Sequence, residues 1–331
     1  MSLPSPIPLP IPNLPASSIH IIYDFITPRE EEYLIQRIDD LGGDTTSPDQ
    51  AQSPQTEDAP IQGQVEPEPR PARPGKASTR WGWTELNGRR SMYWGGSLTK
   101  KSTLLPLPMP DIMTSKYPHV LRRMQEATTK LGWVEGLNHC LVNEYLPGQG
   151  ILAHTDGPAY APIVTTLSLG SHTILQFTPR SDRATPSDEK SDSTAPLNSF
   201  EPGSNSNEQS EPFSLFLPPR SLILVQDNLY EDWLHSIESK KEDTMDDLMR
   251  CSNWGMWWER GADTFSTGSE EEEEEERRRE MKQGDVLSER GIEELIRRRK
   301  FVESGNGWDR GRRVSLTCRI VERVVKGFKI G

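Results

Sequence analysis

Two histidines and an aspartate have the types and the spacing of ligands to one metal ion. His154 and Asp156 are two residues apart in ILAHTDG, a segment predicted to be a strand, so we expect both side chains on one face. His235 follows a second predicted strand, within DWLHSIES, where the sheet could return it to the same place. Two histidines and one carboxylate leave three positions open on an octahedral ion, the arrangement of non-haem Fe(II) oxygenases. An HxD triplet is weak evidence by itself, because such tripeptides occur by chance.

A second polar set lies near the end of the chain, in RVSLTCR. Arg313, Ser315, Thr317 and Arg319 occupy alternate positions, so they are predicted to share one side of a strand. Two arginines directed into the interior need anionic partners, because an unpaired buried charge is costly. A dicarboxylate cosubstrate would be such a partner, since a guanidinium can hold a carboxylate by two parallel hydrogen bonds. The alternative is a basic edge strand that faces solvent.

The elements that must position these residues are mostly short predicted strands separated by turn residues. From HCLVNEYL onward the chain is rich in such strands, a pattern typical of an antiparallel sheet. Their ranges are 139–146, 151–157, 163–170, 172–178, 213–228 and 313–325.

Helices are expected before these strands. An apolar run at 19–26 predicts a strand, and Thr27 with Glu30 forms a capping box ahead of a helix in PREEEYLIQRID. Apolar residues at helical spacing predict a second helix from Pro118 to Leu131. These elements favour an α+β fold with a double-stranded β-helix (jelly-roll) core, flanking N-terminal helices and long disordered insertions.

The composition indicates where the chain is not expected to fold. Mean hydropathy is −0.69, and 28 prolines lie mainly outside the predicted strands. We expect a Pro-rich disordered arm at 1–18 and a single domain at 19–331. Low-complexity insertions are predicted at 42–75, 179–212 and 262–307. The third insertion contains seven consecutive glutamates and a predicted helix near GIEELIRRRKF.

The net charge of −12 argues at first against a nucleic-acid partner, which requires a basic surface. The three insertions carry net charges of −4, −4 and −5, however, so the rest of the chain totals about +1. Within that remainder, residues 76–178 carry +4 and residues 308–331 carry +5. A basic face on the folded core is therefore compatible with the sequence.

The cysteines and the lengths of the apolar runs limit the cellular compartments in which the protein is expected. Cys140, Cys251 and Cys318 are far apart and form no CxxC pair, which fits a reducing compartment, and Cys140 and Cys318 are predicted to be buried core residues. No apolar run approaches the roughly 20 residues of a membrane-spanning helix. We therefore expect a soluble intracellular protein, in the nucleus and the cytoplasm, without a membrane partner.

Four elements in order resemble the catalytic core of the AlkB family of Fe(II)/2-oxoglutarate-dependent dioxygenases. They are NEY at 143–145, PGQGILAHTDGP with SLG, the later His235, and RVSLTCR. RRSMYWGG and DFITPREEEYL add to the resemblance, which covers about 20–41, 80–178, 213–258 and 308–325 and is strongest to the subfamily called AlkB homologue six.

The resemblance implies a ligand set and a reaction. Asn143 and Tyr145 would hydrogen-bond the carboxylates of 2-oxoglutarate, and Arg313 would pair with its distal carboxylate. Ser315, Thr317 and Arg319 would complete the pocket. Fe(II), 2-oxoglutarate and O2 together would hydroxylate a C–H bond, and a hydroxylated N-alkyl group would leave as an aldehyde.

The substrate is less well defined, because members of the family act on DNA, RNA or protein. A flipped base needs an aromatic slot and basic residues for phosphates, and Arg89, Arg90, Tyr93 and Trp94 are suitable types. Their alternative role is core and edge packing. Tyr160, just after HTDGP, is a further candidate. The acidic insertions could instead bind protein partners.

Three hypotheses remain open from the sequence. The first is an active dioxygenase that demethylates or hydroxylates alkylated nucleic acid, with a protein substrate as its variant. The second is a catalytically weak module of the same fold that binds nucleic acid or protein. The third, a zinc hydrolase, is disfavoured because it leaves the inward arginines and the NEY strand without a role.

Overall fold

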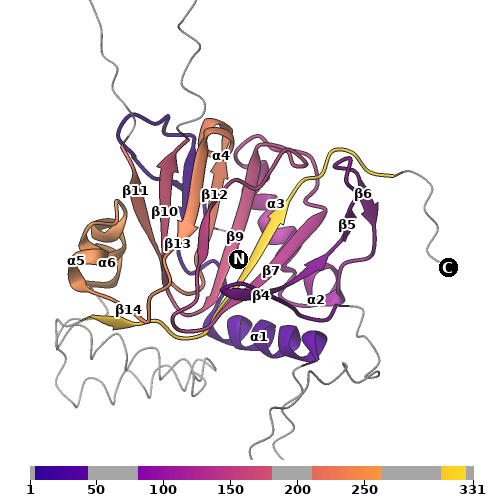
Figure 1. Ribbon diagram of the computed structural model, residues 1–331, viewed down its shortest axis with the longest axis horizontal. Helices are drawn as coiled ribbons and strands as arrows, with labels where there is room; N and C mark the ends of the chain where they lie inside the picture. Colours follow the sequence, from indigo (N-terminus) through magenta and orange to yellow (C-terminus); the bar gives the residue numbers. More distant parts are fainter. Residues whose placement is uncertain (1–3, 44–80, 181–210, 263–306, 326–331) are drawn as a thin grey trace, which may run out of the picture.

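The computed structural model describes residues 4–43, 81–180, 211–262 and 307–325 (Figure 1). The predictions of disorder at 42–75, 179–212 and 262–307 therefore fall almost wholly outside the described residues. The predicted helix near GIEELIRRRKF also lies outside them.

Two antiparallel sheets make up most of the described chain. The larger sheet has the order β1 (Ile7–Pro8), β2 (Ile19–Ile22), β12 (Leu222–Gln226), β9 (Ile163–Gly170), β16 (Arg313–Arg319), β7 (His139–Tyr145), β4 (Arg89–Trp94) and β3 (Thr84–Leu86). The smaller sheet has the order β11 (Phe213–Leu217), β10 (Thr173–Pro179), β13 (Trp233–Ile237) and β8 (Ile151–His154). The two sheets form a jelly roll, which confirms the predicted core.

The position of β16 decides which way its side chains point. It is the yellow strand in Figure 1, between β9 and β7, and is therefore central in the larger sheet. Every residue of β16 is buried. Val314, Leu316 and Cys318 pack in the core on the outer face, so the alternate residues face the smaller sheet. The solvent-facing edge strand considered from the sequence is thereby excluded.

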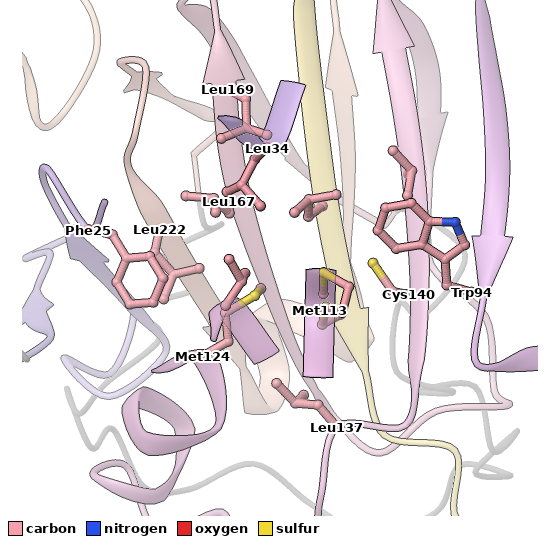
Figure 2. Close-up of a cluster of buried hydrophobic side chains, with 14 of the residues drawn as sticks. Phe25, Leu34, Trp94, Met113, Met124, Leu137, Cys140, Leu167, Leu169 and Leu222 are labelled. Carbon is pink, nitrogen blue, oxygen red and sulfur yellow. The ribbon is translucent and has the colours of Figure 1, made fainter. Parts of the chain in front are cut away.

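Helices cover the outer face of the larger sheet. They are α1 (Pro28–Gly42), α2 (Asp111–Thr114) and α3 (Val120–Thr129). Figure 2 shows the core beneath them, where Leu34 of α1 and Met124 of α3 lie near Leu167 of β9. The predicted capping box begins α1: the Thr27 amide donates to Glu30 Oε2 at 2.8 Å, and the Glu30 amide donates to Thr27 Oγ1 at 3.3 Å.

Several short elements were not predicted. They are β1, β3, β4, α2, β5 (Gly96–Leu98), β6 (Leu104–Pro106), α4 (Asp227–Asp232), β14 (Glu242–Asp243), α5 (Met245–Met249), α6 (Trp254–Ala262) and β15 (Trp308–Asp309). Trp254 and Trp257 of α6 pack edge-on against Phe216 of β11, with ring centroids 5.2 and 4.7 Å apart. This contact fixes α6 against the smaller sheet. No helix in the described ranges is long and apolar enough to cross a membrane.

The prediction of a disordered arm at 1–18 is wrong for residues 4–18. Ile7 and Pro8 pair with β2, and Leu9 and Ile11 are buried at 1% and 6% exposure. The alternation of apolar residues with proline explains this packing, because every second side chain enters the core. The prolines lie along the edge of the sheet, where a missing N–H removes no internal bond and discourages further strand pairing.

The cysteines behave as predicted. Cys140 and Cys318 lie opposite each other on β7 and β16, both at 0% exposure, and belong to the core on the outer face. Cys251 is also buried, and all three are free thiols. They are packing residues of the fold.

Candidate metal and cosubstrate site

The structure brings His154, Asp156 and His235 together. His235 of β13 lies directly opposite His154 of β8, with ring centroids 4.3 Å apart. One ligand atom from each of the three residues lies within 4.8 Å of the others. Nitrogen and carboxylate ligands at such separations fit a single transition-metal ion.

His154 and Asp156 lie together, but not because both side chains project from one face of a strand, as the sequence predicted. Strand β8 ends at His154, so Asp156 lies in the irregular segment beyond it rather than on the same strand face. The register between β8 and β13 also shifts, because His154 pairs with His235 while Ile151 pairs with Ile237. Bulges of this kind re-aim side chains next to active sites.

A backbone carbonyl selects the tautomer of His154. Nδ1 of this ring lies 2.8 Å from the carbonyl oxygen of Leu152. A carbonyl oxygen can only accept, so Nδ1 carries the proton and Nε2 keeps its lone pair for a metal. The backbone of β8 thus orients the histidine ring.

The charges around the triad suit a metal ligand set. Burial alone would raise the pKa of Asp156, but the positive charge of Arg319, whose Nη2 lies 2.5 Å from Oδ1, helps lower it. Burial lowers the pKa of His235 to about 4. At neutral pH the site therefore offers a carboxylate and a neutral imidazole, the forms that bind metals.

The triad opens into a cavity of about 100 Å³ between the two sheets. Apolar side chains from both sheets, among them Phe177, Leu217 and Ile223, form much of its wall. The same cavity is lined by every residue predicted to bind the cosubstrate: Asn143, Tyr145, Arg313, Ser315, Thr317 and Arg319. One cavity therefore contains both predicted sets.

Arg313 is buried without a negative partner among the described residues. It is 4% exposed, its Nη2 donates to Ser168 Oγ at 2.9 Å, and its guanidinium lies 5.6 Å from the Tyr145 ring centroid. Its Nε has no hydrogen-bond partner in the described structure. Burial lowers the pKa of Arg313 to about 10. A carboxylate supplied from outside would satisfy this guanidinium, so the pocket fits a dicarboxylate ligand.

Three of the five residues considered for the substrate lie at or near this cavity. Arg89 lines it, and its Nε donates to Asn143 Oδ1 at 3.2 Å. Tyr160 has the guanidinium of Arg319 4.9 Å from its ring centroid. Tyr93 is 53% exposed, and its ring stacks on that of His139 at 5.5 Å.

Arg90 and Trp94 lie on the other face of β4, away from the cavity. Arg90 forms an ion pair with Glu144, and Trp94 is fully buried beside Cys140 in the outer core, as Figure 2 shows. Strand parity explains the difference, since Arg89 and Tyr93 alternate with Arg90 and Trp94. The packing role considered from the sequence is the correct one for Trp94.

Sequence reasoning missed three residues of this region. Ser168 contacts Arg313, and only the pairing of β9 with β16 brings it there. His139 lies between Tyr93 and Tyr160. It precedes Asn143 on β7 with the same strand parity, so the alternation of side chains could have placed it on the cavity side. Tyr230 lines the cavity from α4, a helix too short for any periodic signal.

Comparisons with known proteins give one family match and several similar proteins. Residues 18–319 match the model of the 2OG-Fe(II) oxygenase superfamily. A relative from Danio rerio, "Probable RNA/DNA demethylase ALKBH6", is 32% identical over 232 residues, which cover 69% of this chain and 72% of the relative. "Uncharacterized protein L905" of Acanthamoeba polyphaga mimivirus is 30% identical over 104 residues, 31% of this chain and 37% of that protein. A solved structure of OsALKBH1 aligns with 92% of this chain and 98% of its own, at a TM-score of 0.39 and 13% identity.

Proposed function

The chain belongs to the AlkB family within the 2OG-Fe(II) oxygenase superfamily, and from this premise we propose that it oxidatively demethylates or hydroxylates alkylated nucleic acid. It is a dioxygenase that uses Fe(II), 2-oxoglutarate and O2. The observation that carries the proposal is the shared cavity, in which a histidine–aspartate–histidine triad lies with a buried arginine that lacks a negative partner among the described residues.

The geometry supports a role for each part of the ligand set. We propose that His154, Asp156 and His235 hold the iron, and that Arg313, with Asn143 and Tyr145, holds 2-oxoglutarate. Ser315, Thr317 and Arg319 complete the pocket. When bound, iron and 2-oxoglutarate couple decarboxylation to succinate and CO2 with hydroxylation of a C–H bond, one oxygen atom of O2 entering each oxidised product.

The chain itself positions the reactants and keeps water out. Arg313 fixes one end of the cosubstrate, and Arg319 balances the charge of Asp156. The apolar wall from Phe177, Leu217 and Ile223 excludes water, which strengthens these electrostatic contacts. No strong acid or base is needed, because a hydroxylated N-methyl group leaves as formaldehyde on its own.

Two features support nucleic acid as the substrate class. The relative from Danio rerio carries the name of a probable RNA/DNA demethylase. Arg89 at the cavity offers a cation for a phosphate, and Tyr93 presents an exposed ring on which an unpaired base can stack. Tyr160 lies between this ring and the triad. It contacts His139, on which Tyr93 stacks, and Arg319, which contacts Asp156.

A substrate screen tests the proposal. Fe(II)-loaded protein with 2-oxoglutarate is offered N-methylated DNA and RNA oligonucleotides and methylated peptides, and formaldehyde and succinate are both quantified. We expect the two products in equal amounts with at least one oligonucleotide. Turnover of peptides alone would assign a protein substrate, and binding without either product would favour the catalytically weak module.

A further inference from the structure

Tyr230 presents a polar group to the cavity that no contact in the described structure uses. It lies on α4 and lines the same cavity as His154, Asp156 and His235. The residue is only 9% exposed, and its hydroxyl oxygen is buried without a hydrogen-bond partner among the described residues. A buried hydroxyl that forms no hydrogen bond costs about 1–3 kcal/mol, so a fold rarely keeps one without a use.

The sheet register places α4 at the end of the cavity opposite Arg313. Val164 of β9 pairs with Arg319 of β16 on one side and with Val225 of β12 on the other, and α4 begins two residues after Val225. Arg313 pairs with Gly170, at the far end of β9. The helix therefore lies beside Arg319 and the triad. Arg313, the proposed partner of the distal carboxylate of 2-oxoglutarate, is about 20 Å from Arg319 along the backbone of β16.

Contacts at both ends hold α4 in place. Gln226, just before the helix, accepts a hydrogen bond from Trp133 Nε1 at 2.9 Å. The amide of Asp227 donates to the carbonyl of Pro162 at 3.0 Å, and the amide of Arg180 donates to the carbonyl of Asp232 at 3.1 Å. Tyr230 is thus carried by a short helix fixed on both sides, which pre-organises its hydroxyl.

The hydroxyl is suited to donate. Burial raises the pKa of Tyr230, and the negative charge of Asp156 raises it further, so the phenol stays protonated. The nearby hydroxyl of Tyr160 differs, because it lies 3.4 Å from His139 Nδ1. A site with a buried donor of this kind discriminates strongly against ligands that lack the matching acceptor.

We propose that Tyr230 is a specificity-determining residue whose hydroxyl donates a hydrogen bond to an acceptor atom of the substrate base, a carbonyl oxygen or an unprotonated ring nitrogen. This inference rests on the proposed function, because it takes the substrate to be a nucleobase. It assigns to α4 the recognition of the reacting base, whereas Arg89 and Tyr93 contact its flanking nucleotides.

The test compares Tyr230→Phe with wild type in the anaerobic holoenzyme, loaded with Fe(II) and 2-oxoglutarate. Fluorescence anisotropy gives the Kd for fluorescein-labelled single-stranded DNA and RNA oligonucleotides that carry one N-methylated base. We expect Tyr230→Phe to raise this Kd about five- to tenfold, the effect of one neutral hydrogen bond. The Kd for 2-oxoglutarate should not change, because the hydroxyl has no partner to lose among the described residues, and the Tm should rise rather than fall, because the variant no longer buries an unsatisfied hydroxyl.

Tyr23→Phe is the matched control. Tyr23 is also a buried tyrosine, but its hydroxyl accepts from Asn253 Nδ2 at 3.1 Å and does not line the cavity. This variant should lower the Tm and leave oligonucleotide binding unchanged. If Tyr230→Phe left the Kd for the oligonucleotide unchanged, the inference would be overturned and the proposed function would stand. The same would follow if the variant raised the Kd for 2-oxoglutarate instead of that for the oligonucleotide. Failure of wild type to bind any methylated oligonucleotide would overturn the proposed function and this inference together.

Discussion

Arg313 links stability to ligand binding at the scale of a single residue. Its guanidinium is buried, and within the described structure it has Ser168 as a hydrogen-bond acceptor but no carboxylate. Burying a charge without a partner destabilises a fold, and the penalty applies to the apo protein at neutral pH. A dicarboxylate ligand removes it, so the residue favours the bound state by disfavouring the empty one.

Replacement of Arg313 by Met should therefore stabilise the apo protein while it abolishes 2-oxoglutarate binding. We expect a gain on the order of 1–3 kcal/mol in the free energy of unfolding, measured by urea denaturation. Added 2-oxoglutarate should raise the Tm of wild type and not that of the variant. Arg122→Met, an exposed helix arginine, should change neither quantity. A less stable Arg313→Met protein would contradict the view that this charge is unpaired.

Residue types and spacing, together with the family resemblance, were enough to predict which residues converge on one cavity, because ligands must converge and their types are few. They were not enough for the substrate residues. In RRSMYW, polar and apolar residues occur at both odd and even positions, so the sequence does not tell which side chains of β4 face the cavity. Arg90 and Trp94 were therefore kept as substrate candidates with packing as the alternative, and the structure directs them to the outer face.

At the scale of elements, a buried ion pair joins β14 to Arg310, the residue that follows β15. Asp243 is fully buried, and Arg310 donates to it twice, at 2.7 and 2.6 Å. His172 Nε2 lies 3.1 Å from the same carboxylate, and Arg310 also donates to the carbonyl of Glu238 at 2.7 Å. The strand that carries Arg313 begins three residues after Arg310, so this pair anchors the start of β16.

Asp243→Asn should destabilise the protein by about 3–5 kcal/mol, because it leaves a buried arginine uncompensated. Burial alone would raise the pKa of Asp243, but the hydrogen bonds from His172 and Arg310 outweigh burial and lower it to about 2. A lowered carboxyl pKa gives stability that is present above the unfolded value of 3.8 and is lost as pH falls towards 2.

The difference in unfolding free energy between wild type and Asp243→Asn should thus be constant above about pH 5 and shrink between pH 4 and 2. Urea denaturation at a series of pH values measures it. Asp309→Asn, at an exposed position on β15, is the control and should have no effect. A gap that persists unchanged to pH 2 would show that the carboxylate charge does not hold this contact.

The N-terminal arm makes a second prediction for an element. Leu9 is 1% exposed and packs in the core with Ile19 and Ile21 of β2. Leu9→Ala should cost about 2–5 kcal/mol, the range for a buried leucine, whereas Pro10→Ala at the exposed edge should cost much less. Chemical denaturation of both variants decides the matter. Equal stability of the two would restore the expectation of a disordered arm.

Periodicity predicted β2, most strands from β7 to β12, β16 and the two longest helices, and it failed where its signal is weak. The arm was misassigned because a high proline content usually opposes packing, yet here Leu9 and Ile11 alternate with the prolines. The helices α4 and α5 have six and five residues, too few to show a helical repeat. Helix α6 is rich in tryptophan on several sides, so its amphipathic pattern is obscured.

At the scale of the whole molecule, the charge of the long connecting segments affects how strongly the site binds a polyanion. The segments outside the described residues connect α1 to β3, β10 to β11 and α6 to β15, and none interrupts a strand. Closing a long connection costs free energy that grows only logarithmically with its length, so the core tolerates all three. Their negative charge should nevertheless weaken the binding of nucleic acid.

Replacing the seven glutamates Glu270–Glu276 by glutamine should strengthen oligonucleotide binding severalfold at low salt, because it removes long-range repulsion. The advantage should fade as salt shortens the screening length from about 10 Å at 0.1 M to about 3 Å at 1 M. Kd values from anisotropy across a salt series measure this. A variant with the order of residues 263–306 scrambled keeps the charge and should behave as wild type. A gain that is independent of salt would exclude the electrostatic explanation.

The central claim is that one cavity binds iron through His154, Asp156 and His235 and 2-oxoglutarate through Arg313. Succinate formation tests it most directly, measured after anaerobically Fe(II)-loaded protein with 2-oxoglutarate is exposed to O2. Wild type and Arg122→Ala should form succinate, whereas folded His154→Ala and Arg313→Ala should not. Absence of succinate from folded, iron-loaded wild type, with and without methylated oligonucleotides, would contradict the claim, and so would undiminished turnover in either site variant.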